Sequence, residues 1–331
     1  MGDGNDMNFL KYKLYPIAGD ASYRKFFRLK QLNKSKIFIF AKKEKYKNLI
    51  AYFAVNNFLR AKKILAPRIY SHNFNKGMVV VEDFGDLTYY KLLQKSKNKF
   101  TIYKKLVDLL LKIEKIKPKS NIKIVGKRRH RINKYSINYL LKESDLFFDW
   151  YLPLVFNKKK ALNIKNKSRK FLLNLYNQLN FSNSKFVHRD YHSQNLMKVG
   201  NKIGVIDSQD AIIGNPAYDL VSLIDDVRIK TSKTLKNRIY EYYLQKAAKI
   251  YKNNPEEFKE DFNILSVQRS LKIIGIFSRL FKRDNKKEYL KFIPYTWQLL
   301  EMRMRSEIFF EIKKILDLNI SKKTRKKKLV K

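Results

Sequence analysis

The sequence contains no cysteine among its 331 residues. Disulfide bonds and thiolate zinc or redox sites are therefore excluded, which fits a reducing compartment. Long apolar runs are also missing, since stretches such as 78–81 and 109–111 fall far below the roughly 18 residues that a membrane span requires. Residues 1–6 are polar and acidic and lack the basic-then-apolar order of an export signal. We expect a cytoplasmic chain without a membrane span.

Acidic residues are scarce, because 29 Asp and Glu stand against 73 Lys and Arg, a formal charge of +44. Such a charge favours nucleic acid or another anionic partner. The lysines are nevertheless spread from Lys11 to Lys331, with many Asn, Ile, Tyr and Phe, as an AT-rich genome produces. We favour compositional drift and do not expect a nucleic-acid partner, although a basic surface and a nucleic-acid face would use the same residues. Residues 321–331 are expected to form a frayed basic tail.

The first third of the chain predicts a small sheet with one helix. Alternating apolar and polar residues indicate strands at Tyr23–Leu29, Lys36–Phe40 and Met78–Glu82. Apolar residues at helical spacing indicate a helix between the second and third strands, at 48–63. A turn follows at 83–86, where we place the boundary between a small N-terminal lobe (1–85) and a larger helical lobe (86–320).

The rest of the chain reads as mostly helical, with one strand-rich insert at 185–207. The fold class is therefore α+β, without internal repeats. The helices are expected at 100–116, 132–148, 168–179, 216–227, 236–251, 255–281 and 289–315.

The most informative motif begins at His188-Arg189-Asp190 and continues to Asn195, and a strand then leads to Asp207. This spacing matches the H-R-D-x-x-x-x-N loop of kinases and their second, metal-binding aspartate. Phosphoryl transfer needs a carboxylate beside the attacking hydroxyl and hard oxygen ligands for Mg²⁺. Asp190 would be the catalytic carboxylate, and Asn195 and Asp207 would be the metal ligands.

A loop in which Asp, Asn and Ser only cap turns is the alternative. Apolar segments at 186–187 and 196–197 bracket the loop and favour the functional interpretation. We expect His188 to be a buried, structural residue that holds the backbone. Asp219 would either cap a helix or support the catalytic loop, and we favour support.

Two further segments are candidates for nucleotide contact. Gly19, Ala21 and Ser22 lie in a turn whose backbone N–H groups could face phosphates, but an ordinary hairpin turn would look the same. Glu82 and Phe84 end a strand at the lobe boundary, where exposed backbone groups would bind adenine. Both assignments depend on position more than on residue type.

With these motifs, the chain resembles the aminoglycoside phosphotransferase superfamily, and within it the bacterial anomeric kinases of N-acetylmuramate and N-acetylglucosamine. The resemblance covers most of residues 15–300. Its segments are 19–24, 80–89, 143–153, 188–197, 206–211, 269–284 and 289–297.

The resemblance implies a protein-kinase-like two-lobed fold whose first lobe binds nucleotide, with ATP and Mg²⁺ as cofactors. It implies transfer of the γ-phosphate of ATP to the anomeric hydroxyl of an amino sugar during cell-wall recycling. Gln209, Asp210 and Arg269 would contact the substrate. Two positions depart from the family pattern. Ser208 replaces an aromatic residue, and the phosphate-contacting strand lysine is assigned to Lys42 only because it follows the second strand.

A kinase of an aminoglycoside or a choline-like amine is the alternative enzyme. A cationic substrate needs an acidic pocket, and the helical lobe offers only Glu143, Asp145, Asp225 and Asp226 near suitable positions. A neutral or anionic sugar is therefore favoured. An inactive, kinase-like nucleic-acid-binding module is a further alternative, which the intact catalytic motif opposes. The oligomeric state stays open.

Overall fold

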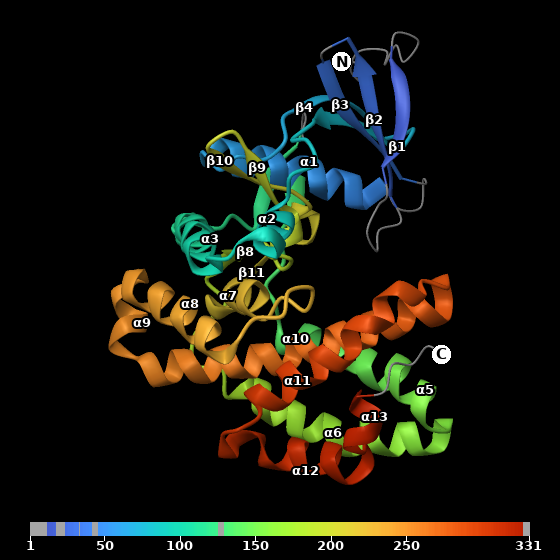
Figure 1. Cartoon of the computed structure of the whole chain (residues 1–331), viewed down its shortest axis with the longest axis vertical. Coiled ribbons are helices and arrows are strands. Elements are labelled where there is room, and N and C mark those ends of the chain that lie inside the picture. Colours follow the sequence, from blue (N-terminus) through green and yellow to red (C-terminus); the bar gives the residue numbers. More distant parts are fainter. Residues whose placement is uncertain (1–11, 18–23, 33, 42–45, 125–128, 327–331) are drawn as a thin grey trace. The chain divides into compact units, whose positions relative to one another are not determined.

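The computed structural model (Figure 1) describes five stretches of the chain: residues 12–17, 24–32, 34–41, 46–124 and 129–326. The chain divides into two compact units. The first contains Met1–Asn133 and Lys185–Ile213, and the second contains Lys134–Ser184 and Gly214–Lys331. The lobe boundary expected after residue 85 follows the last strand of the sheet, whereas the two units are divided by their internal contacts. The predicted lobe boundary therefore stays a prediction.

The first unit holds a five-stranded antiparallel sheet with strand order β1-β2-β3-β5-β4. Two of these strands, β1 and β4, are absent from the sequence-based prediction, and the other three lie where expected within two residues. The strands are β1 (Lys13–Ile17), β2 (Lys25–Gln31), β3 (Lys34–Phe40), β4 (Ile69–Asn73) and β5 (Met78–Glu82).

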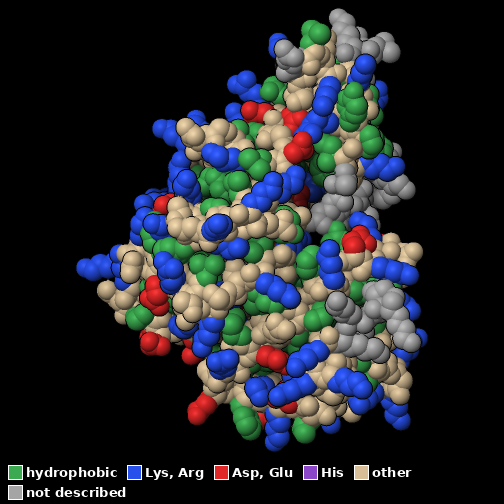
Figure 2. All heavy atoms as spheres, viewed as in Figure 1, with side chains coloured by type: hydrophobic (Ala, Val, Ile, Leu, Met, Phe, Trp, Pro, Cys, Tyr) green, Lys and Arg blue, Asp and Glu red, His purple; other side chains and the backbone are tan. Residues whose placement is uncertain are grey.

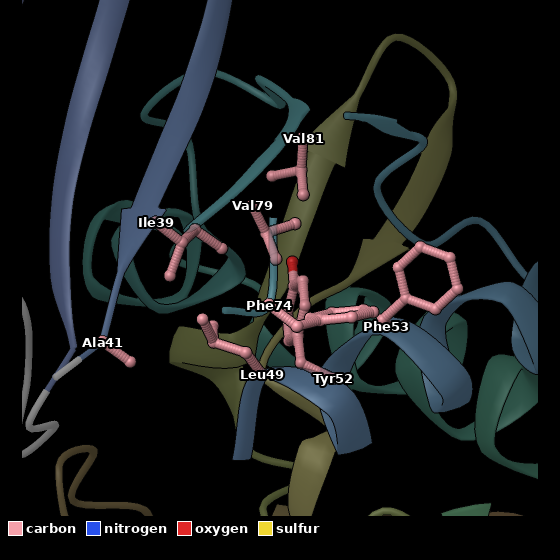
Figure 3. Packing of buried hydrophobic residues seen from close by; sticks show 8 residues of the cluster. All are labelled: Ile39, Ala41, Leu49, Tyr52, Phe53, Phe74, Val79 and Val81. Atoms are coloured by element: carbon pink, nitrogen blue, oxygen red, sulfur yellow. The ribbon is translucent and has the colours of Figure 1, made fainter. Parts of the chain in front are cut away.

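Side chains alternate between the two faces of the sheet, as the pleat requires. One face packs on helix α1 (Tyr46–Ala61), where Ile39, Val79 and Val81 meet Leu49 and Tyr52 (Figure 3). The opposite face of the sheet carries a smaller apolar cluster, formed by Leu29, Phe38 and Val80. The helix is thereby fixed on one side of the sheet.

Short elements complete the first unit. Helix α2 (Tyr89–Lys95) is capped by Thr88, and helix α3 (Lys99–Glu114) is capped by Asn98, near the helix expected at 100–116. The remaining strands form three two-stranded pairs. They are β6 (Asn121–Lys123) with β7 (Arg129–Arg131), β8 (Lys185–Val187) with β11 (Ile212–Gly214), and β9 (Leu196–Val199) with β10 (Lys202–Val205).

The second unit is helical and is built on α10, a helix of 30 residues. A Cβ on Gly275 of this helix would overlap the backbone of Leu146 and Phe147, so glycine permits the close approach. The α-helices are α4 (Ile137–Leu146), α5 (Leu152–Val155), α6 (Lys158–Asn177), α7 (Ala217–Ile224), α8 (Lys233–Lys246), α9 (Lys249–Asn253), α10 (Pro255–Asp284), α11 (Ile293–Arg303), α12 (Phe310–Asn319) and α13 (Lys322–Lys326).

Four helix predictions need correction. The single helix expected at 236–251 is two helices, α8 and α9, because α8 ends at the Ala247 cap. The helix expected from residue 132 begins at Ile137, because Ser136 caps it by accepting a hydrogen bond from Tyr139 N at 3.3 Å. The helix expected from 168 begins ten residues earlier, after the Asn157 cap. The single helix expected at 289–315 is interrupted, since turns of 3₁₀ helix flank α11 at Lys287–Phe292 and Glu307–Phe309.

The expectation of a frayed tail is wrong for residues 322–326, which form α13. Arg325 is buried and pairs with Glu301 at 2.7 Å and Asp317 at 2.8 Å, and its guanidinium lies over the Trp297 ring. One basic residue of the expected tail is therefore part of the packed structure.

The many Lys and Arg side chains are scattered over the visible surface and do not gather into one patch (Figure 2). This distribution agrees with the drift interpretation of the +44 charge on that face. Among the described residues, no helix combines the length and apolar character needed to cross a membrane.

A buried ion cluster ties together the helices of the second unit. Asp225, which follows α7, accepts hydrogen bonds from Arg303 at 2.9 and 3.0 Å and from Ser266 at 2.7 Å. Lys236 of α8 lies 3.1 Å from the same carboxylate. Burial alone would raise the pKa of Asp225, but Arg303 and Lys236 outweigh it and hold the pKa well below its ordinary value.

We predict that Asp225→Asn destabilises the protein by about 3–5 kcal/mol at pH 7, because Arg303 and Lys236 stay buried without their carboxylate. The native carboxyl has the lower pKa, so its contribution is complete above the unfolded pKa and is lost as the pH falls. The difference in unfolding free energy between wild type and Asp225→Asn, measured by urea denaturation, should therefore decrease as the pH falls from about 5 to about 3. The control is Asp149→Asn, which breaks an exposed pair with Lys165 and should cost at most about 1 kcal/mol. Equal effects of the two substitutions would contradict the assignment.

Candidate active site

The end of the β9–β10 hairpin brings two predicted metal ligands together. The strands are antiparallel, with Leu196 opposite Val205. Asn195 immediately precedes β9, and its carbonyl accepts a hydrogen bond from Ile206 N at 3.0 Å. Asp207 is the next residue, so Asn195 and Asp207 lie at the same open end of the hairpin.

The loop before the hairpin is anchored by two buried side chains. His188 is 1% exposed, and its Nε2 lies 3.0 Å from the carbonyl of Ile206. Tyr191 is fully buried and donates a hydrogen bond to the carbonyl of Leu106 on α3 at 2.8 Å. The His188 contact is the one that a structural role requires, and it joins the loop to the strand that carries Asp207.

Asp190 and Asn195 are also coupled directly. The Asn195 amide nitrogen donates to the backbone carbonyl of Asp190 at 3.0 Å, which leaves the amide oxygen available for the predicted role of metal ligand. Within the part of the chain that is described, no cluster of three or more His, Asp or Glu side chains is suited to a metal. Two oxygen ligands on a hairpin nevertheless fit Mg²⁺, which keeps several waters and binds substrate phosphates.

The backbone is left-handed at two positions of this site. Arg189 has φ 73° and Asp207 has φ 64°, a conformation that residues other than glycine rarely adopt. Such strain persists only where the surrounding structure imposes it, and it concentrates at functional sites. Both residues flank or carry the candidate catalytic groups.

Arg24, to which the sequence analysis gave no role, reaches this site from the position just before β2. Its guanidinium forms an ion pair with the Asp207 carboxylate and donates to Gln209 Oε1 at 3.0 Å. Gln209 in turn donates to Asp210 Oδ2 at 3.1 Å. The amide of Gln209 is thus engaged at both ends, whereas Asp210 is exposed and keeps the stronger case for substrate contact.

A second arginine of β2 holds the segment after β5. Arg28 donates to Asp83 at 2.6 and 3.1 Å and to Asp86 at 2.9 Å. The hydrogen bond from Arg28 holds the pKa of Asp86 below its ordinary value. Asp83 also accepts from Gly85 N at 2.8 Å, and the positive φ of Gly85 permits this tight turn.

The two predicted adenine contacts beside this turn differ. Glu82 accepts a hydrogen bond from Arg68 N at 3.0 Å, so its carboxylate ties β4 to β5. Phe84 packs its ring on Gly204 of β10, where any Cβ would meet the ring. Phe84 therefore lies over the hairpin that carries Asn195 and Asp207.

Several predicted residues belong to the second unit or lie outside the described residues. Asp219, in the first turn of α7, and Arg269, whose guanidinium lies 5.7 Å from the centre of the Tyr218 ring, are buried in the second unit. Their supporting and substrate-binding roles stay predictions. Four nucleotide-binding candidates lie outside the described residues: Gly19, Ala21, Ser22 and Lys42.

Sequence comparison identifies relatives over most of the chain. A model of the phosphotransferase enzyme family matches residues 13–257. An N-acetylmuramate/N-acetylglucosamine kinase from Pseudomonas aeruginosa is 28% identical over 293 residues, covering 87% of this chain and 83% of the relative. The kinase of the same name from Neisseria meningitidis is 26% identical over 280 residues, covering 84% and 81%.

Solved structures show the same fold. A choline kinase from Streptococcus pneumoniae has a TM-score of 0.61 at 14% identity, covering 88% of this chain and 95% of its own. An ADP-bound aminoglycoside phosphotransferase has a TM-score of 0.58 at 14% identity, covering 87% and 92%. The expected α+β, protein-kinase-like fold is therefore confirmed.

We predict that Ser208→Ala lowers the free energy of unfolding by about 1–3 kcal/mol, because the buried Asn56 Oδ1 loses the hydroxyl that donates to it. Ser208 is fully buried and donates to Asn56 Oδ1 on α1 at 3.3 Å, which ties the residue after Asp207 to the helix under the sheet. Chemical denaturation measures the change, with the exposed Ser35→Ala as control. A variant as stable as wild type would show that this hydrogen bond contributes nothing.

Proposed function

Because the chain belongs to the phosphotransferase enzyme family, we propose that it is an ATP-dependent kinase of N-acetylmuramate or N-acetylglucosamine that phosphorylates the anomeric hydroxyl. The anomeric oxygen would form a bond to the γ-phosphorus of ATP while the bond from that phosphorus to the β,γ-bridging oxygen breaks. The products are the sugar 1-phosphate, ADP and a proton. Since the reaction consumes ATP, we place it in the cytoplasm, in cell-wall recycling.

The observation that carries the phosphotransfer assignment is that Asn195 and Asp207 meet at the open end of one hairpin, while the backbone carbonyl of Asp190 accepts a hydrogen bond from the Asn195 amide. The hairpin closes through the Asn195 carbonyl, and the loop closes through the Asn195 amide. The three residues to which the proposal gives the roles of base and metal ligands thus belong to one short segment, an arrangement that supports phosphoryl transfer. The names of the relatives support the choice of sugar.

Each residue has a separate task in this proposal. Asp190 orients the anomeric hydroxyl and accepts its proton late in the transfer, since this hydroxyl is already more acidic than an ordinary alcohol. The Asn195 amide oxygen and the Asp207 carboxylate would hold Mg²⁺, which would supply positive charge against the phosphates. His188 and Tyr191 keep the loop in place.

The acids of the second unit favour a neutral or anionic substrate. A cationic aminoglycoside or amine needs carboxylates without a partner, whereas each of the four acids considered for such a pocket faces a cation of its own chain. The pairs are Glu143 with Lys272 at 2.9 Å, Asp145 with Arg169 at 3.2 Å, Asp225 with Arg303 at 2.9 Å and Asp226 with Arg228 at 3.9 Å.

A kinase of choline or of an aminoglycoside is the second candidate. The structures that share the fold include enzymes of both names, but a likeness at 14% identity extends only to the fold. The relatives detected by sequence carry the sugar-kinase name over at least 80% of this chain. We therefore rank the amino sugars first.

We predict that two isosteric changes separate the base from the metal ligands. Asp190→Asn should lower turnover by about two or more orders of magnitude with little change in Mg²⁺-dependent ATP binding, because Asp190 acts at the reacting oxygen. Asp207→Asn should weaken ATP binding in Mg²⁺ together with turnover, because it removes a negative ligand. Steady-state kinetics and calorimetric titration with a non-hydrolysable ATP analogue measure both. Near-normal turnover in Asp190→Asn would remove that residue from its role.

We predict that an amino sugar outcompetes a cationic acceptor. Equal concentrations of N-acetylmuramate, N-acetylglucosamine, kanamycin and choline share one enzyme pool with labelled ATP, and the products are resolved at low conversion. Such competition reports relative specificity constants. A preference for either sugar by more than about tenfold, about 1.4 kcal/mol in transition-state binding, is expected. A dominant kanamycin or choline product would overturn the sugar assignment and leave the kinase assignment intact.

A further inference from the structure

The face of the sheet that packs on α1 has no lysine in the described part of β3 or β5. Its residues on those strands are Ile37, Ile39, Val79 and Val81, with Ala41 just beyond β3. The two described lysines of β3, Lys34 and Lys36, share the alternation of Phe38 and therefore point to the opposite face. A kinase strand lysine that binds nucleotide phosphates has no counterpart among these residues.

Cations do line this face on the neighbouring strand β2. Phe26 packs with the α1-facing cluster, so Arg24 and Arg28, two residues to either side, follow the same alternation. Arg28 binds the segment after β5 through Asp83 and Asp86. Arg24 reaches the other end of the site and pairs with Asp207.

Arg24 is held in place more firmly than a surface arginine. It is only 7% exposed, and its guanidinium lies 5.4 Å from the centre of the Phe26 ring and 5.7 Å from that of Tyr52. Burial, opposed by Arg24 itself, raises the pKa of Tyr52 to about 12, so the tyrosine stays neutral beneath the guanidinium. Gln209 adds a hydrogen bond of 3.0 Å. The side chain is thus preorganised beside a predicted metal ligand.

We infer that Arg24 is the phosphate-binding cation of this enzyme, held by Asp207 until metal and nucleotide enter. The inference rests on the proposed function, because it concerns the same site. With Asp207 as a ligand of Mg²⁺ in the proposed site, the guanidinium would lose its carboxylate partner and would be left to bind phosphate oxygens. Its planar fork of N–H groups matches phosphate oxygens. Arg24 thereby takes the phosphate-binding role for which β3 and β5 offer no lysine on this face among the described residues.

The first test compares ligands with and without phosphates. Isothermal titration measures the affinity of ATP with Mg²⁺ and the affinity of adenosine for wild type and for Arg24→Gln. In Arg24→Gln we expect the affinity for ATP to fall by more than about tenfold, which is about 1.4 kcal/mol. The affinity for adenosine should change by less than about twofold. An unchanged ratio of the two affinities would overturn the inference.

Two variants of the same strand serve as controls. Arg28→Gln should weaken the affinities for ATP and for adenosine by the same factor, because Arg28 binds Asp83 and Asp86 beside the predicted adenine contacts. Lys25→Gln, on the exposed position next to Arg24, should leave both affinities unchanged. If Arg24→Gln unfolds, Arg24→Lys keeps the charge without the planar fork and should retain part of the preference for ATP. Loss of adenosine binding together with ATP binding in Arg24→Lys would instead indicate a scaffold.

A metal titration separates a competitor from a scaffold. Arg24 and a divalent cation compete for Asp207 in our inference, so Arg24→Gln should bind free Mn²⁺ more tightly than wild type in electron paramagnetic resonance. A residue that only positions Asp207 would give weaker Mn²⁺ binding when replaced, which would contradict the inference. If wild type itself bound no ATP in Mg²⁺, the proposed function would fail. Normal wild-type binding with an indifferent Arg24→Gln would refute the inference alone.

Discussion

The antiparallel pairing of β9 with β10 is the interaction on which the candidate site depends. Because Leu196 lies opposite Val205, the residue before one strand and the residues after the other meet at the open end of the hairpin. A shift by one residue would turn Asn195 away from Asp207. Lys198 N and Val205 N, which donate to Leu87 O and Leu65 O at 2.8 Å, fix the hairpin to the rest of the first unit.

Sequence reasoning reached those parts of the structure that local spacing determines. The catalytic loop and the strand that follows it span about twenty residues. The spacing of the motif was therefore enough to predict that Asn195 and Asp207 lie close together. Strand β1 was not predicted, because almost every residue in it is exposed and its sequence shows no alternation of apolar and polar residues. Helix α13 escaped because five residues are too few to show helical periodicity. Its burial depends on ion pairs with Glu301 and Asp317.

Long-range ion pairs are the part that no local pattern could predict. The contact between Arg24 and Asp207 joins positions 183 apart in the sequence, and Arg28 and Asp83 are 55 apart. With 73 basic residues, composition does not mark which arginines matter, and the resemblance over 19–24 includes Arg24 without giving it a partner. Acids are the scarcer partner, so the ion pairs of the few carboxylates identify the cations that have a structural task. Both the Asp207 contact and the Asp225 cluster emerge from that search.

The left-handed backbone at Arg189 and Asp207 sets stability against chemistry. Each such residue costs on the order of 1–3 kcal/mol, and glycine would relieve that cost at either position. At 207 glycine would also leave the buried guanidinium of Arg24 without its carboxylate, so relief of backbone strain there is opposed by the loss of the ion pair. The left-handed aspartate is therefore retained by a contact of the fold as well as by its predicted role in the chemistry.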